Sequence, residues 1–181
     1  MREIVLPETK PATEWVNGRA LQKMSPQRRH ALAQAVFTSE LLAWARAHGR
    51  GRVGPEWEFR LQPPGEVRRP LVPDVAYISY ERLPYGAADD IADIPRIAPD
   101  VVVEVLSPGD RKRDLREKID VYLACGASAV FEVNTRESTV IVHDRGEPRT
   151  FGFDSVIAHE SLPGFAMHAR MLFEEPLPKK R

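Results

Sequence analysis

The sequence APDVVVEVLSPGDRKRDLREKIDVYLACGASAVFEVN, from Ala98 to Asn134, contains two apolar runs on either side of an amphipathic segment. It predicts a buried strand, a short Ser-Pro-Gly loop, a helix and a second buried strand, because runs that are apolar on both faces are typical of strands covered on both sides. Two charged residues lie where apolar ones are expected. One is Glu104, which interrupts the run from Val101 to Leu106. Burying its carboxylate costs free energy unless the carboxylate is paired or binds a metal.

The second is Lys118, which the helical repeat places on the packing side of the helix. With Asp114 taken as zero and about 100° per residue, Lys118 falls near ~40°, between Cys125 near ~20° and Tyr122 near ~80°. The opposite side carries the plainly polar residues Arg113, Arg116, Glu117 and Asp120. An alternative is an Asp114–Lys118 pair at the border of a solvated face, worth a few tenths of a kcal/mol. A lysine can also extend its ammonium from such a position into solvent.

Length, charge and cysteine content limit the classes of protein. The 181 residues predict one domain with one hydrophobic core. Lys and Arg number 26, as do Asp and Glu, so a nucleic-acid role would need a local basic patch. Cys125 is the only cysteine, which fits a reducing compartment, and its helical position favours a small core residue over a nucleophile. No signal peptide or membrane-spanning apolar run is visible, so we expect a cytoplasmic protein.

The patterns divide the chain into an N-terminal arm (1–12), a single domain (13–175) and a polar tail (176–181). The domain opens with a hairpin from Glu14 to Leu21, because the Asn-Gly pair within it favours a type I′ turn. A helix follows, with Ser25 as its N-cap and Pro26 at its first position, and it ends at His48 before Gly49. Its apolar face is formed by Leu32, Val36, Phe37 and Trp44.

Polar residues of this helix and of the turn after it leave alternatives open. His30 could bind a phosphate or be a surface or capping residue. Glu40 lies on the apolar side, where it could be an additional acidic ligand or make an interhelical or dimer contact. A basic cluster around the next turn could be a solvated loop or touch a phosphate backbone; it consists of Arg46, His48, Arg50 and Arg52.

The middle of the chain introduces a second unexpected acid. Strands are expected from Glu56 to Leu61 and from Asp74 to Ser79. Pro73 precedes Asp74, so Asp74 enters the sheet at its first residue, although Asp is disfavoured in strands. It could be a simple turn or cap, or a functional residue. The long loop that follows carries acids whose spacing imposes no ligand geometry, and they read as a solvated segment: Asp89, Asp90 and Asp93.

Further strands are expected around residues 130–134, 139–143 and 149–153, before a closing segment from Ser161 to Phe173. The order of helix, strands, helix and strands predicts an α/β domain with a mixed sheet. No Gly-rich phosphate loop, Gly-x-Ser-x-Gly elbow or zinc-type spacing of Cys and His is present in the sequence.

Asp74, Glu104 and Lys118 together suit one kind of chemistry. Two carboxylates on neighbouring strands can hold a hard cation such as Mg²⁺, which takes one or two protein carboxylates and completes its shell with water and phosphate oxygens. A nearby lysine can orient a water or stabilise the transition state. This combination predicts a site for phosphodiester hydrolysis.

The same residues carry a resemblance to a known family. Pro73-Asp74, the block Glu104-Val105-Leu106-Ser107-Pro108 and a downstream lysine resemble the PD-(D/E)XK nuclease superfamily, and more narrowly the Uma-two family of restriction-endonuclease-like proteins. The resemblance covers nearly the whole chain. Its other matching pieces are the hairpin 14–21, Met24-Ser25-Pro26 with His30, Asp114-Leu115-Arg116-Glu117-Lys118, Tyr122, Gly126 and Leu162-Pro163-Gly164-Phe165.

The resemblance implies a restriction-endonuclease-like mixed β-sheet flanked by α-helices, with an N-terminal β-hairpin. It implies metal ligation by Asp74 and Glu104 and catalysis by these two residues with Lys118, since Leu106 occupies the usual lysine position. It further implies Mg²⁺ or Mn²⁺ as cofactor, nucleic acid, chiefly DNA, as substrate, and a homodimer. Glu14 matches a hairpin glutamate of the family without an assigned role. The sequence departs from the family pattern at Val130-Phe131 and Asn134, where an aromatic pair and an aspartate are usual.

Two alternatives to a nuclease are open. The protein could have a nuclease fold and bind nucleic acid or a protein partner without cutting. It could also be a structural dimer in which Glu104 and Lys118 form a buried ion pair, in which case Lys118→Met should keep or raise stability.

Overall fold

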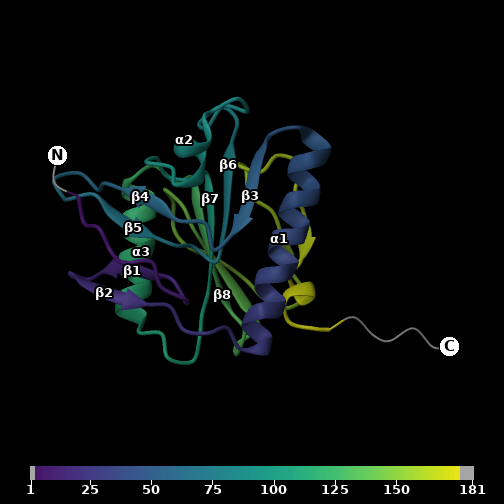
Figure 1. Ribbon diagram of the computed structural model, residues 1–181. Coiled ribbons are helices and arrows are strands. Elements are labelled where there is room, and N and C mark those ends of the chain that lie inside the picture. The colour runs from purple at the N-terminus through teal and green to yellow at the C-terminus, as the bar shows by residue number, and fades with distance from the viewer. Residues whose placement is uncertain (1–2, 176–181) are drawn as a thin grey trace.

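The computed structural model describes residues 3–175, in which six strands form one mixed sheet (Figure 1). The strands are β3 (Gly51–Pro55), β6 (Val75–Ser79), β7 (Val101–Val105), β8 (Ala129–Asn134), β9 (Thr139–His143) and β10 (Arg149–Phe151). Their order across the sheet is β10-β9-β8-β7-β6-β3. β7 and β8 run parallel, and the other neighbouring strands are antiparallel. The predicted α/β class with a mixed sheet is confirmed.

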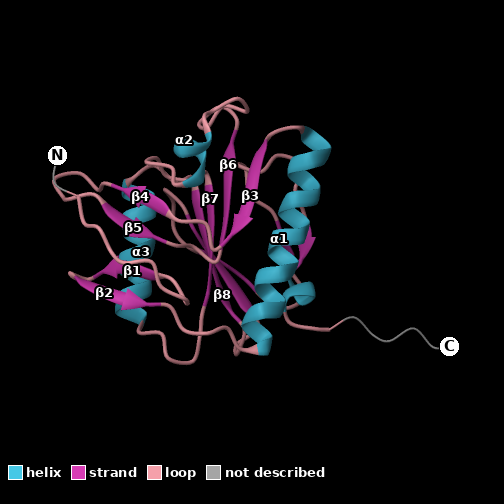
Figure 2. Ribbon diagram, viewed as in Figure 1, coloured by secondary structure: helices cyan, strands magenta, loops and turns pink. Residues whose placement is uncertain are grey.

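One helix covers each face of the sheet, α1 (Arg28–His48) on one side and α3 (Lys112–Ala124) on the other (Figure 2). Alternation along β7 supplies both faces, because successive side chains of a strand point to opposite sides. Val103 packs in the core beneath α1, whereas Val102 packs in the core that includes Ile119 of α3. Glu104 follows the same alternation and therefore points to the α3 side.

Two small hairpins lie on the α3 side of the sheet. They are β1 (Thr13–Val16) with β2 (Arg19–Gln22), and β4 (Phe59–Leu61) with β5 (Arg69–Leu71). At the tip of the first, Asn17 and Gly18 have φ values of 48° and 74°, the left-handed values that a type I′ turn needs, so the predicted hairpin is confirmed. The remaining elements are α2 (Asp89–Asp93), β11 (Val156–Ile157), β12 (Met167–His168) and the 3₁₀ helix η1 (Ala169–Leu172).

The first helix begins later than the sequence predicts. Ser25 is not its N-cap, because the helix begins at Arg28 after Gln27, whose φ of −83° and ψ of 164° are extended. Pro26 restricts the residue before it to extended conformations, and the chain remains extended through Gln27. The end of the helix is as predicted, since Gly49 follows with a left-handed φ of 60°.

Two other segments differ from their predictions. The expected strand 56–61 is shorter in the structure, because Glu56 has a left-handed φ of 50° and β4 begins only at Phe59. The acidic segment expected as loop forms the short helix α2. The arm makes an isolated bridge from Glu3 to Arg68, while the predicted tail 176–181 lies outside the described residues. None of the helices within residues 3–175 has the length and apolar character that crossing a bilayer requires.

Candidate active site

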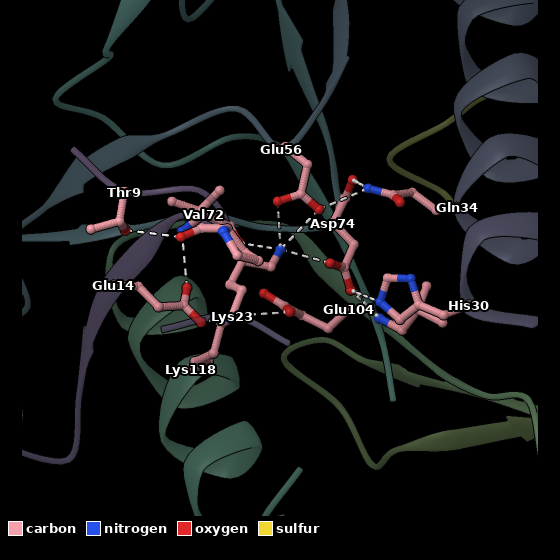
Figure 3. Close-up of polar contacts among 12 residues, drawn as sticks. Thr9, Glu14, Lys23, His30, Gln34, Glu56, Val72, Asp74, Glu104 and Lys118 are labelled. Carbon is pink, nitrogen blue, oxygen red and sulfur yellow. Dashed lines mark hydrogen bonds and ion pairs between the residues drawn. The ribbon is translucent and has the colours of Figure 1, made fainter. Parts of the chain in front are cut away.

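The structure brings Asp74, Glu104 and Lys118 together in one pocket of about 280 Å³ (Figure 3). Asp74 directly precedes β6, Glu104 lies in β7, and Lys118 lies in the middle of α3. β6 and β7 are antiparallel with Val75 opposite Val103. Continuing that register by one residue places Asp74 opposite Glu104. The sheet pairing therefore explains why two acids that are 30 positions apart in the sequence share one site.

Lys118 is buried between two carboxylates. Its Nζ lies 2.7 Å from Oε2 of Glu104 and 2.9 Å from Oε1 of Glu14. The hydroxyl of Tyr122, one helical turn later, donates a hydrogen bond of 3.0 Å to the other oxygen of Glu104. Asp114 accepts hydrogen bonds from Asn17 (2.8 Å) and Arg19 (2.5 Å). The inward position of Lys118 is thus confirmed, and the alternative of a solvated Asp114–Lys118 pair is wrong.

Asp74 is held by donors from three segments. Lys23 Nζ lies 2.7 Å from its Oδ1, while Oδ2 accepts the Val105 backbone N–H at 2.7 Å and lies 3.3 Å from Nε2 of His30. His30 is buried, so the expectation of a surface or capping residue is wrong. His30 lies in the first turn of α1, which begins at Arg28, and it lines the pocket together with Lys23 and Met24.

Two site residues had no role in the sequence-based prediction. Glu14 is buried, and besides Lys118 it binds the Val72 backbone N–H through Oε2 at 3.0 Å. Alternation along β1 could have indicated this, because Glu14 shares a face with buried Val16. Lys23 follows β2 in a segment without helix or strand, and its position gave no such periodic signal.

Burial and charge shift the pKa values in this cluster. Burial raises the pKa of Glu104 to about 7; Lys118 opposes this effect, while Asp74 and Glu14 add to it. Burial also acts to raise the pKa of Asp74, but Lys23 and His30 outweigh it and hold that pKa well below its usual range. The pKa of His30 is raised, because its bond to Asp74 outweighs the opposing effect of burial.

The donor set suits a hard divalent cation. Asp74 and Glu104 offer carboxylate oxygens, and the ammonium groups of Lys23 and Lys118 already bind one oxygen of each. Within residues 3–175, no group of three or more His, Cys, Asp and Glu side chains is arranged to hold a metal. Such a closed cage is what structural zinc requires, whereas Mg²⁺ needs one or two carboxylates with water and phosphate. Asp74 and Glu104 match the one or two carboxylates that Mg²⁺ takes from a protein.

Other candidate residues lie outside the pocket. Glu40 is ten residues beyond His30 on α1, about 15 Å along the helix axis. The basic cluster is at the far end of the same helix, where Arg52 donates to the Leu83 carbonyl at 2.7 Å and lies over the ring of Tyr80. The acids of α2 lie at one end of the sheet, away from the pocket (Figure 1). Cys125 packs against the core on the α3 side, and burial raises its pKa, as expected of a small core residue.

Comparison with known proteins identifies a family and a similar solved structure. A family model described as "Putative restriction endonuclease" matches residues 4–170. A crystal structure described as that of "a putative nuclease belonging to DUF820" from Anabaena variabilis is similar, with 26% sequence identity, a TM-score of 0.81 and 93% of each chain covered. No curated protein matches the chain.

The family description and the neighbour both support a nuclease, and restriction-endonuclease-like families usually use divalent metals. The match extends over most of the chain, and the fold is that of the nuclease neighbour. The chain belongs to the Uma2 family of restriction-endonuclease-like proteins.

Proposed function

We propose that this protein is a Mg²⁺-dependent endonuclease that hydrolyses phosphodiester bonds of DNA, with Mn²⁺ able to replace Mg²⁺. The main supporting observation is that Asp74 and Glu104 lie opposite each other on neighbouring chain segments of one pocket. Lys118 Nζ lies 2.7 Å from Oε2 of Glu104. Asp74 and Glu104 would hold the metal. The family description and the neighbour's identity support the nuclease class.

The roles of the side chains follow from their contacts. A bound divalent cation lowers the pKa of a water molecule and neutralises charge on a phosphodiester. Lys118 carries a buried ammonium that can orient the attacking water or stabilise charge on the phosphoryl oxygens. Glu14 and Tyr122 position this pair, because Glu14 binds Lys118 and Tyr122 binds Glu104. A preorganised donor of this kind costs no reorganisation during the reaction.

Basic side chains at the pocket support a nucleic-acid substrate. Arg19 and Arg111 line the pocket, and the exposed residues Lys112 and Arg113 begin the adjoining helix α3. A chain of zero net charge needs a local basic patch to bind a phosphate backbone, and we propose that Arg111, Lys112 and Arg113 supply it, since Arg19 is paired with Asp114. Binding to such a patch weakens as salt is added, since bound phosphates release counterions.

Cleavage of supercoiled plasmid, single-stranded DNA and RNA, each with Mg²⁺, Mn²⁺ or EDTA, tests this function. We expect metal-dependent cutting of DNA by the wild type and a loss of at least about a hundredfold in rate for Asp74→Asn, Glu104→Gln and Lys118→Met. Glu132→Gln is a matched control, because Glu132 lies opposite Glu104 on β8 but pairs with His143 outside the pocket. Cutting that survives Glu104→Gln would contradict the assignment.

One observation favours a second candidate, a module that binds nucleic acid or a protein without cutting. Each carboxylate oxygen of Asp74 and Glu104 already has a protein donor, so these two carboxylates are hydrogen-bonded without a metal. This candidate predicts DNA retention in a mobility-shift assay that is unchanged by EDTA, without any cutting. Assembly as a homodimer stays a prediction for either candidate, and sedimentation velocity would check it.

A further inference from the structure

Lys23 occupies a position in the pocket that the proposed reaction does not use. Its Nζ lies 2.7 Å from Oδ1 of Asp74, 3.0 Å from the Val72 carbonyl and 3.1 Å from Glu56 (Figure 3). The side chain is only 11% exposed. Asp74 thus has a protein cation in direct contact with an oxygen that the proposed function assigns to a metal.

We propose that Lys23 is a tethered cation that competes with the divalent metal for Asp74 and thereby sets the metal affinity of the site. The inference rests on the proposed function, because it takes Asp74 as a metal ligand. A lysine ammonium and a divalent cation repel each other strongly at the separations found within one partly buried site. Metal binding therefore requires Lys23 to leave Oδ1 of Asp74.

The two lysines of the pocket differ in their freedom to move. Lys118 is fixed in the middle of α3 and binds two buried glutamates. Lys23 lies in the segment 23–27 between β2 and α1, which has neither helix nor strand. Its second acidic partner, Glu56, has a side chain that is 45% exposed, so Lys23 can keep this partner while it releases Asp74. Lys23 is therefore the cation that yields to the metal.

The contact also gives the pocket a stable state without metal. Asp74 is buried, and an unpaired buried carboxylate is costly. Lys23 neutralises it until a stronger cation arrives. Lys23 thus stabilises the metal-free protein and lowers its affinity for the metal. Replacing Lys23 should therefore raise the metal affinity.

Binding of Mn²⁺ alone, followed by electron paramagnetic resonance in the absence of nucleic acid, tests the inference. We expect Lys23→Met to bind Mn²⁺ at least about tenfold more tightly than the wild type. Lys10→Met is the matched control, since it removes an exposed lysine of the N-terminal arm that does not line the pocket and should leave the affinity unchanged. Asp74→Asn should weaken binding in either background. Lys23→Gln replaces Lys23→Met if the latter does not fold.

A second measurement uses the wild type alone. Acetylation of lysines by acetic anhydride, followed by mass spectrometry, should show Lys23 protected without metal and several-fold more reactive with saturating Mn²⁺. Lys10, which is exposed and does not line the pocket, should label at one rate in both conditions.

The outcomes separate the inference from the function on which it rests. Tighter Mn²⁺ binding by Lys23→Met together with metal-induced labelling of Lys23 supports it. Asp74-dependent Mn²⁺ binding that Lys23→Met leaves unchanged or weakens would overturn the inference and leave the proposed function standing. Absence of Mn²⁺ binding in every variant would overturn both.

Discussion

At the scale of single residues, the main feature of the pocket is the balance of charge around Lys118. One buried ammonium serves two buried carboxylates, those of Glu14 and Glu104. A simple pair could be replaced by apolar side chains without loss, but this arrangement differs, because removal of the lysine leaves two acids without their cation. The expectation that Lys118→Met would keep or raise stability applied to an isolated pair with Glu104, which is not what the structure contains.

We predict that Lys118→Met lowers the free energy of unfolding by about 3–5 kcal/mol at pH 8. The loss should be smaller at pH 5. Glu104 has a pKa of about 7 in the folded protein against 4.5 for the free side chain, so the folded state binds the proton more tightly and stability falls as pH rises through this window. Without Lys118 the pKa of Glu104 rises further and the dependence steepens. Urea unfolding at the two pH values measures the difference.

A compensated variant provides the control for this prediction. Glu14→Gln and Glu104→Gln, added to Lys118→Met, remove all three charges and should recover much of the lost stability. A single Lys118→Met protein as stable as the wild type at pH 8 would contradict the charge balance described for the pocket.

At the scale of elements, the β1–β2 hairpin positions part of the site. It carries Glu14 on its first strand and leads directly to Lys23, and Arg19 ties it to Asp114 of α3. Its register depends on the turn, in which Gly18 has a φ of 74°. An L-residue with a side chain in the left-handed region costs about 1–2 kcal/mol, so a side chain at Gly18 would strain the turn.

Gly18→Val should therefore destabilise the protein by about 1–2 kcal/mol, with strain as the cause, because no atom lies within 4 Å of the added Cβ. Gly86→Val is the control, since Gly86 is equally open and its φ is not positive. Thermal unfolding of both variants measures the difference. Equal losses for the two glycines would show that the turn conformation does not matter.

At the scale of the whole molecule, the sheet separates two cores. The core beneath α1 contains Phe131, which is fully buried. Its ring packs edge to face against that of Phe37, with 5.8 Å between the ring centroids. The core on the α3 side includes Ile119 and Tyr122, whose hydroxyl binds Glu104. Glu104 and Lys118 thus lie on the α3 side of the sheet, away from the core beneath α1.

Phe131→Ala should cost about 3–5 kcal/mol of stability, because it opens a cavity in the α1-side core. At a temperature at which the variant remains folded, its cleavage rate should match the wild type, since the ring lies on the opposite face of the sheet from Lys118. Tyr85→Ala is the control, because that ring is 80% exposed and its removal should change stability by about 0.5 kcal/mol or less. A Phe131→Ala protein that is folded but does not cleave would contradict the separation of the two faces.

The sequence supported some of these features better than others. Local signals were sufficient for β7, α3 and β8, because periodicity and charge position are properties of short segments, and they placed Lys118 inward. The Asn-Gly turn fixed the hairpin for the same reason. The contacts of Lys23 and His30 with Asp74 join segments about 40–50 residues apart, and no local pattern encodes them. The start of α1 was misplaced because Ser-Pro is a good cap locally, whereas in the structure Gln27 is extended and the helix begins at Arg28.

The most direct test of the central claim is a crystal structure with Mn²⁺, in which anomalous scattering locates the metal. We predict a peak within coordination distance of carboxylate oxygens of both Asp74 and Glu104, with Lys118 beside it and Lys23 withdrawn from Asp74. A peak only at surface acids such as Asp89 or Asp90, with Lys23 still bound to Asp74, would contradict the assignment of Asp74 and Glu104 as ligands of one catalytic metal.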